Sequence, residues 1–164
     1  MGMSAPLQAG ISYGGDAAAG SGADLAFSNP YSLVPAAIGA AAAYGFSPTV
    51  RHYIHGQIGK TAFGVCCNSD KQGHFDYLCG VEVSDFWRLP SNFTHQRIAA
   101  QKYAVFSHRE HISTIRSTLN TIWNKWLPES GLEVVDAPDF ERYGEGFDTR
   151  TGAGGLEIWI PIKP

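Results

Sequence analysis

One carboxylate lies inside an otherwise apolar stretch near the end of the chain. Glu157 stands in the run GLEIWIPIK at 155–163. An ionised glutamate in apolar surroundings costs free energy unless a cation or a hydrogen-bond donor meets it. Because aromatic residues make up 12% of the chain and their ring faces attract cations, this pattern predicts a receptor for an organic cation. The alternative is that Glu157 lies on the solvent face of a half-buried edge strand.

Aromatic side chains could form the walls of such a receptor. The candidate ligand-binding residues are Glu157, Trp159, Tyr77, Phe75, Tyr103, Trp123, Phe140, Tyr143 and Phe147. Trp159 shares the strand face of Glu157 by the period of two, and Phe75 shares a face with Tyr77. For Trp123, which lies on a predicted helix, packing in the hydrophobic core is the alternative role. Phe140, Tyr143 and Phe147 come before the last strand and could form a rim.

The other acids and the histidines are weaker candidates for a functional site. Glu141 and Asp76 are expected to be solvated or to cap a hairpin. The six histidines are scattered, and no Cys/His pattern supplies three or four converging ligands, so we expect no metal site. No nucleotide-binding loop or nucleophile motif is present, and we assign no catalytic residue and no cofactor.

Alternating segments bounded by turn residues predict the strands that position these side chains. The first hairpin has strands at 61–67 and 74–83, and the last has strands at 140–143 and 156–162. A further strand is predicted at 97–106. These elements would bring the aromatic candidates onto one sheet.

A single clear helix is predicted between the strands at 97–106 and 140–143. Ser107 followed by Glu110 is typical of a capping box, and Pro128 with Gly131 should end the helix. Apolar residues recur at helical spacing and form one stripe: Ile112, Ile115, Leu119, Ile122, Trp123 and Trp126.

The N-terminal part differs sharply from the rest. Residues 1–45 are an atypical Ala/Gly-rich segment, in which 16–23 should be flexible and 36–43 could be a helix capped by Ser32. Residues 46–164 are dense in predicted strands and helix. We therefore expect a single α+β domain built from two β-α-β-β units, the first atypical, with an antiparallel sheet and a ligand cleft between the halves.

Composition bounds the function class. The chain has 164 residues, a net charge of −3 and no Lys/Arg run, so we expect no direct binding of nucleic acid. No apolar stretch is long enough to span a membrane, and no secretory signal is seen. An odd count of three cysteines, Cys66, Cys67 and Cys79, fits a reducing cytoplasm and buried thiols.

Motifs spread over 57–163 carry a family resemblance. They are FDY and GVEV within 75–83, YAVFSH at 103–108, Thr118, IW and WLPESG within 122–131, PDFERY at 138–143, FD at 147–148 and EIWIPI at 157–162. Together they resemble the gyrase-inhibitor-like small-molecule-binding domain. This is the effector-binding domain of many AraC-type and MerR-type regulators, and it also occurs alone, including in proteins carried on integron gene cassettes.

The resemblance implies a duplicated β-α-β-β fold and a cleft for bulky, often cationic or aromatic compounds. In multidrug-binding members a glutamate of the last strand lies deep in that cleft, and by motif position this residue is Glu157. Some stand-alone relatives are hydrolases. The Ala-rich segment up to Tyr44 departs from the family pattern, which usually has a strand and a Trp-containing helix start there.

The sequence therefore favours a stand-alone, cytoplasmic small-molecule-binding protein related to transcription regulation, rather than an enzyme. Its expected ligands are hydrophobic cations, desolvated by aromatic walls and neutralised by Glu157. Burial should raise the pKa of that carboxyl in the empty cleft, so binding should weaken at acidic pH. The alternatives are a hydrolase with Glu157 as general base and a gyrase-inhibitor-like binder of a protein target; a homodimer is open.

Overall fold

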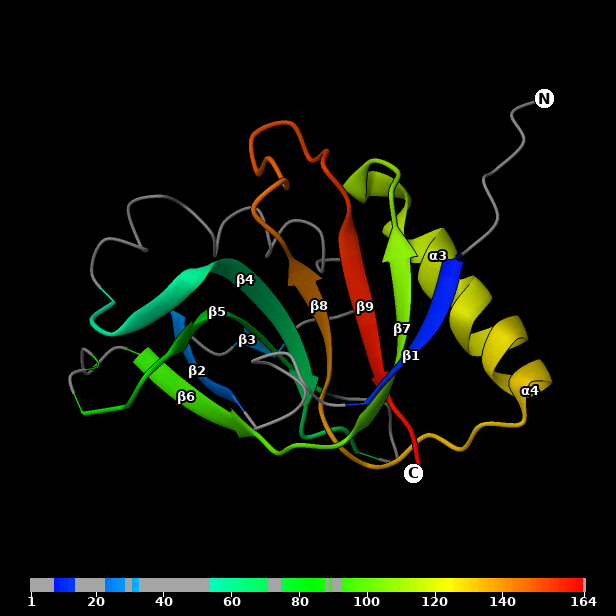
Figure 1. The fold of residues 1–164 in the computed structure, drawn as a ribbon, viewed down its shortest axis with the longest axis horizontal. Coiled ribbons are helices and arrows are strands. Elements are labelled where there is room, and N and C mark those ends of the chain that lie inside the picture. Colours follow the sequence, from blue (N-terminus) through cyan, green and yellow to red (C-terminus); the bar gives the residue numbers. More distant parts are fainter. Residues whose placement is uncertain are drawn as a thin grey trace.

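The computed structural model describes residues 8–13, 23–28, 31–32, 54–70, 75–87, 89 and 93–163. Side chains are described from Ile54 onward. The described strands form one antiparallel sheet of nine strands, with helices packed against it, so the fold class is α+β (Figure 1). Within these residues no helix is long and apolar enough to cross a membrane.

The sheet is arranged almost symmetrically about the border between β4 and β8. Its order is β1-β7-β9-β8-β4-β5-β2-β6, and β3 pairs with β5. The hairpin β4–β5 lies beside the hairpin β8–β9, and β2 flanks β5 as β7 flanks β9. The strands are β1 Gln8–Tyr13, β2 Ala23–Ser28, β3 Tyr31–Ser32, β4 Gln57–Cys67, β5 Asp76–Val83, β6 Phe93–Ile98, β7 Lys102–His108, β8 Asp139–Tyr143 and β9 Leu156–Pro161.

The N-terminal segment contributes strands to this sheet, which the sequence analysis did not predict. β1 pairs with β7, and β2 pairs with both β5 and β6. The backbone pairing of these segments does not depend on the apolar alternation by which strands are recognised in a sequence. The helix expected at 36–43 lies outside the described residues. Of the flexible tract expected at 16–23, residues 16–22 also lie outside them, and Ala23 begins β2.

The strand predicted at 97–106 is two strands. β6 ends at Ile98 and β7 begins at Lys102, at nearly opposite ends of the strand order. The short link therefore carries the chain across the sheet (Figure 1). The sheet curls enough for Ile98 of β6 and Tyr103 of β7 to pack in one hydrophobic cluster. A run of residues with strand propensity does not reveal such a crossing, because propensity is the same on both sides of it.

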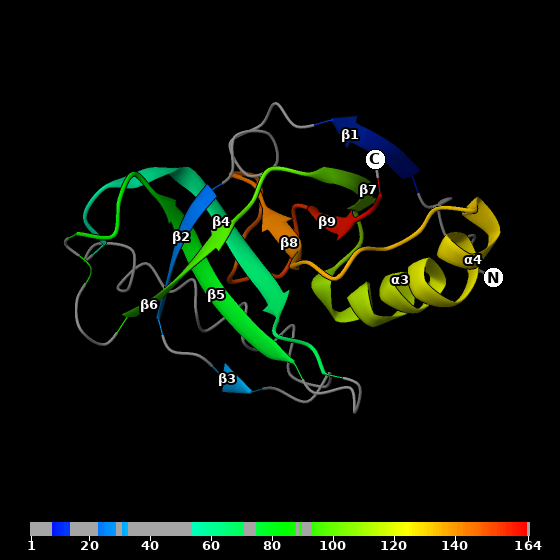
Figure 2. The same cartoon turned by 90° about the horizontal axis from the view of Figure 1, so that it is seen from below.

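The helical segment follows β7 and covers one face of the sheet (Figure 2). It begins with the 3₁₀ turn η2 Ile112–Thr114, continues through α3 Ile115–Thr121 and the π-helical turn η3 Ile122–Trp126, and ends with α4 Leu127–Ser130. The predicted capping box is wrong, because Ser107 belongs to β7 and His111 caps the first turn by accepting from Ser113 N–H.

The end of the helix is partly as predicted. Gly131 terminates α4 in the left-handed conformation, with φ of 70°. Pro128 does not end it, because it falls directly after the π-helical turn, where Leu127 N–H bonds to the Ile122 carbonyl. A proline is tolerated in such a turn because its missing N–H is not required there.

Two hydrophobic clusters occupy the two faces of the sheet. The helix-side cluster contains helix residues such as Ile115 and Ile122 together with Phe106, Tyr77 and Tyr143. The opposite cluster lies inside the curl of the sheet, and its members are Phe63, Val65, Cys67, Leu78, Ile98, Tyr103, Phe140 and Trp159. Alternate residues of each strand therefore enter different cores, and this alternation separates the candidate site residues.

Candidate functional site

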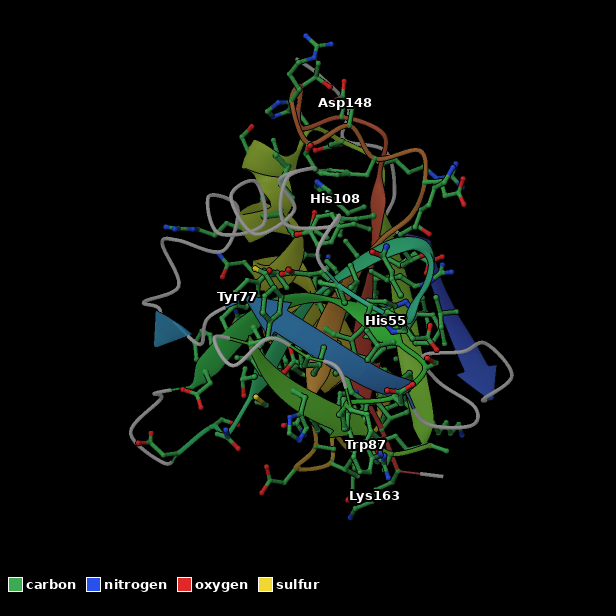
Figure 3. The ribbon with its side chains drawn as sticks, turned by 90° about the vertical axis from the view of Figure 1, so that its left-hand side faces the viewer. His55, Tyr77, Trp87, His108, Asp148 and Lys163 are labelled. Carbon is green, nitrogen blue, oxygen red and sulfur yellow. The ribbon has the colours of Figure 1, made fainter. Side chains whose placement is uncertain are left out.

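The buried acid of this domain is Glu141, on β8, and not the glutamate of the last strand. Glu141 is 4% exposed, so the expectation that it is solvated is wrong. Its Oε2 accepts hydrogen bonds from the hydroxyls of Tyr77 on β5 and Tyr143 on β8, the latter at 3.1 Å. Figure 3 labels Tyr77, which projects from β5 on the helix side of the sheet. We call Glu141, Tyr77 and Tyr143 the Glu141 cluster.

A glycine makes room for this cluster. Gly64 of β4 stands opposite Glu141 on one side and opposite Cys79 on the other. A Cβ atom at Gly64 would clash with the Tyr77 hydroxyl and come within 2.7 Å of Glu141 Oε2. The absence of a side chain at Gly64 therefore allows a tyrosine from β5 to reach across β4 to a carboxylate on β8.

Burial governs the protonation of Glu141. It raises the pKa of the Glu141 carboxyl to about 7, while the hydrogen bonds from Tyr77 and Tyr143 act in the opposite direction. Burial and the nearby carboxylate raise the pKa of both tyrosines well above the usual value, so they remain neutral donors. Glu141 therefore changes its charge close to neutral pH.

A second acid lies two residues away on the same strand. Burial raises the pKa of Asp139 to about 7, and a hydrogen bond from the Cys66 thiol opposes this shift. Burial also raises the pKa of Cys79 to about 12, and it raises the pKa of Cys66 well above the usual value for a thiol. The cysteines here are thus protonated, unreactive thiols that pack in the core.

Aromatic and apolar side chains surround the Glu141 cluster. The ring of Phe147 packs edge-on against Tyr143, with centroids 4.8 Å apart, and Phe75 packs on the same hydrophobic cluster. Trp126 of the helix packs edge-on against Phe106 at 4.6 Å. An acid in such a wall has few water molecules to solvate it, which strengthens its interaction with any cation that reaches it.

The remaining strand candidates lie on the opposite face. The rings of Phe140 and Trp159 stack at 5.5 Å with an interplanar angle of 16°, and Tyr103 meets both edge-on. All three are buried in the cluster inside the curl of the sheet. They are packed aromatic core there, separated from the Glu141 cluster by the sheet.

Glu157 is neither isolated nor deeply buried. Its side chain is 37% exposed, and its Oε2 lies 3.2 Å from Arg142 Nη1 and accepts from Trp159 Nε1 at 3.0 Å. Arg142 faces it because the two residues are direct partners across β8 and β9. The cation that the sequence analysis expected from a ligand is thus available from the chain itself.

The structure therefore divides the predicted set. It brings Tyr77, Tyr143, Phe75 and Phe147 into one hydrophobic cluster on the helix side. The two tyrosines of this cluster bond to Glu141, a glutamate that the sequence analysis expected to be solvated. Trp123 is 42% exposed and belongs to neither cluster. The sequence gives only a weak indication that Glu141 is buried, namely its place between Phe140 and Tyr143 in a short strand. No apolar run on either side marks it, in contrast to Glu157.

The Glu141 cluster combines one titratable acid with two neutral hydroxyl donors in an apolar wall. Such an arrangement can neutralise an organic cation or accept a proton from a bound molecule. Among the described residues, no group of three or more His, Cys, Asp or Glu side chains could hold a metal ion.

Comparison with known proteins identifies the type of domain. Residues 24–163 match the family model of the GyrI-like small molecule binding domain, so the match begins at β2. The transcriptional regulator BrlR of Pseudomonas aeruginosa is 32% identical over 104 residues, which are 63% of this chain and 38% of that protein. The chain thus spans about two fifths of the length of this relative.

Solved structures show the same fold. A structure of SAV2435 bound to tetraphenylphosphonium superposes with a TM-score of 0.67 at 18% identity, covering 97% of this chain and 94% of that one. The integron cassette protein VCH_CASS2 from the mobile metagenome of Vibrio cholerae gives 0.61 at 16% identity, covering 97% and 100%. The C-terminal domain of EcmrR gives 0.64 at 16% identity, covering 97% and 99%.

Proposed function

The chain belongs to the GyrI-like small-molecule-binding domain family, and we propose that it binds hydrophobic organic cations on the helix side of its sheet. Glu141 supplies the negative charge, Tyr77 and Tyr143 orient it, and Phe75 and Phe147 contribute aromatic walls. The proposal keeps the ligand class expected from the sequence and moves the acid from Glu157 to Glu141.

The observation that carries the proposal is a carboxyl, that of Glu141, which is 4% exposed and has no cationic partner among the residues that the structure describes. Its hydrogen bonds come from two neutral hydroxyls, and burial raises its pKa to about 7. A carboxylate with neutral donors keeps its full charge available to a cation, whereas the charge of Glu157 is already met by Arg142. Entry of a ligand requires the contacts over Glu141 to open.

The relatives support this ligand class. SAV2435 was solved with tetraphenylphosphonium, a bulky aromatic cation, and shares the fold. BrlR is a transcriptional regulator, and EcmrR was solved in a complex with DNA. By extension, the domain reports the presence of its ligand as an effector-binding module related to transcription regulation.

The fold supports a ligand site between two halves. The strand order is mirrored about the border of β4 and β8, as two β-α-β-β units side by side would give. Gly64 and Glu141 are register partners at this border. A cleft between the halves would therefore have the Glu141 cluster at its centre.

The decisive experiment is calorimetric binding of tetraphenylphosphonium to wild type, Glu141→Gln and Glu157→Gln. Both variants remove one charge and keep the shape of the side chain, on neighbouring strands. We expect Glu141→Gln to lose at least tenfold in affinity and Glu157→Gln to stay within about twofold of wild type. Triphenylphosphine oxide, an uncharged analogue, should bind all three proteins alike.

The opposite pattern would return the role to Glu157, as the sequence analysis predicted. Equal binding by all three proteins would show that neither carboxylate meets the cation, and the proposal would fail.

A second candidate function rests on the same carboxyl. A glutamate whose pKa is about 7, beside neutral tyrosine hydroxyls, has the properties of a general base at neutral pH. Hydrolysis of an electrophilic substrate, lost in Glu141→Gln and following the ionisation of Glu141, would favour a hydrolase over a receptor.

A further inference from the structure

A hollow lies away from the Glu141 cluster, where the end of β7 meets the loop between β8 and β9. Its volume is about 230 Å³. The walls include Ser107, Arg109, Arg142, Gly144, Gly155 and Glu157. Figure 3 labels His108, at the end of β7, and Asp148, in the β8–β9 loop, which mark this end of the molecule.

The ionic side chains of this hollow favour an anion. Two guanidinium groups, those of Arg109 and Arg142, and one carboxylate, that of Glu157, line the hollow, in a chain whose overall charge is −3. Glu157 is already engaged, because its Oε2 meets both Arg142 Nη1 and Trp159 Nε1. Arg142 has five N–H donors and uses one in this pair. Arg109 is exposed and makes no hydrogen bond or ion pair within the described part of the chain.

Glycines keep the walls open and fixed in shape. Gly155 has a φ of +76°, and a Cβ there would come within 3.2 Å of the His108 carbonyl oxygen. Gly154 packs so closely on Gly146 that a Cβ would clash with that backbone. Gly144 is different, because a Cβ on it would meet no atom within 4 Å. The loop is thus tightly packed on itself and leaves free space at Gly144.

We propose that this hollow binds a small oxyanion, a carboxylate or phosphoryl group, between Arg109 and Arg142. Planar guanidinium groups bind carboxylate and phosphoryl groups through paired N–H···O bonds. Two guanidinium groups would neutralise the charge of the oxyanion and fix its orientation. At roughly 30 Å³ per water molecule, the hollow has room for about eight waters, enough for an oxyanion with a short substituent. The ligand class is opposite in charge to that of the Glu141 cluster, so this inference does not rest on the proposed function.

The test is a titration of the ¹⁵N-labelled full chain, followed by amide chemical shifts at constant ionic strength. Inorganic phosphate and acetate serve as probes in separate arms, with sodium chloride as the reference salt. We expect saturable shifts confined to the amides of Gly144, Gly154, Gly155 and Arg109, and the tighter probe identifies the preferred oxyanion.

Variants locate the site. Arg109→Gln should weaken binding at least tenfold. Gly144→Leu should do the same by adding a side chain to the wall of the hollow at a position where a Cβ meets no atom within 4 Å. Arg150→Gln is the matched control, because Arg150 lies in the same loop, is exposed and does not line the hollow; it should leave the affinity within about twofold. All variants should keep the wild-type spectrum elsewhere.

Three results would overturn the proposal. Shifts that grow linearly without saturation would mean no site, and equal weakening by Arg109→Gln and Arg150→Gln would mean attraction by general charge. Saturable shifts at other amides would place the anion elsewhere on the surface.

Discussion

Two glutamates, Glu141 and Glu157, lie 16 residues apart in the chain, occupy opposite faces of the same sheet and differ in almost every physical respect. Glu141 is 4% exposed and is held by two neutral tyrosine hydroxyls, whereas the Glu157 side chain is 37% exposed and is paired with Arg142. Burial raises the pKa of Glu141 to about 7. The comparison teaches that an apolar sequence around an acid does not identify the buried acid; the partners across the strands do.

The largest effect should come from the residue that makes room for the Glu141 cluster. Gly64→Ala places a Cβ against the Tyr77 hydroxyl and Glu141 Oε2, which forces the cluster apart. Overpacking of this kind costs about 3 kcal/mol of the free energy of unfolding. Urea unfolding measures it, with Gly144→Ala as the matched control, because a Cβ there meets nothing within 4 Å. A loss below about 1 kcal/mol in Gly64→Ala would show that the cluster shifts freely.

The next effect is that of Glu141→Gln on the pH dependence of the free energy of unfolding. The folded pKa of Glu141, about 7, lies above its ordinary value of 4.5, so the folded state holds the proton more tightly. The stability contributed is complete below pH 4.5 and is lost as pH rises through 7, by up to about 1.4 kcal/mol per pH unit. Glu141→Gln should flatten this decline. Between pH 4 and pH 8 the wild type should lose about 3 kcal/mol of unfolding free energy that the variant keeps.

Urea unfolding at a series of pH values tests this, and Glu157→Gln should retain the wild-type profile. Because burial also raises the pKa of Asp139 to about 7, some decline should persist in Glu141→Gln. An unchanged slope in Glu141→Gln would mean that Glu141 titrates normally.

A smaller effect should follow from removing one hydroxyl. Tyr143→Phe deletes a hydrogen bond that lowers the pKa of Glu141, so that pKa should rise further above 7. Loss of a bond to a charged group costs about 1.5 kcal/mol at pH 8. Carboxyl ¹³C titration reports the shift directly. Tyr103→Phe, on the opposite face with its hydroxyl bonded by Gln101, should leave the Glu141 titration unchanged.

The smallest effect on stability should come from breaking the ion pair of Glu157. Arg142→Gln breaks an ion pair whose two side chains are about one third exposed. Pairs in such positions contribute at most about 1 kcal/mol, and we expect about 0.5 kcal/mol, reduced further at high salt. Thermal unfolding at low and high salt measures it. A loss above 2 kcal/mol would show that Glu157 depends on Arg142 as a buried charge would.

Part of the fold follows from local sequence. Alternating apolar residues predicted the strands at 61–67, 74–83, 140–143 and 156–162, and the structure has β4, β5, β8 and β9 at these places. The apolar stripe predicted the helix. The same reasoning missed β1 and β2, because a segment rich in Ala, Gly and Ser carries no alternation to recognise. It also joined β6 to β7, because local propensity does not register a crossing between distant parts of a sheet.

The candidate site shows the same division. Tyr77, Tyr143, Phe75 and Phe147 were predicted as ligand-binding residues, and their roles remain predictions. The structure gathers all four in one hydrophobic cluster, and two of them bond to the same acid. Tyr103, Phe140, Trp159 and Glu157 were predicted with them and lie on the other face. The period of two separated the residues of each strand correctly, yet it did not say which face of one strand joins which face of the next.

By itself, the sequence determined the class of domain: an α+β fold with an acid among aromatic residues, in a family that binds small molecules. It also determined which residues within each strand share a face, because side-chain direction alternates locally. Only the tertiary structure decided which acid is buried. That choice depends on the register of β4, β5, β8 and β9, on the empty space at Gly64 and on the arginine opposite Glu157, and each of these is a contact between residues far apart in the chain.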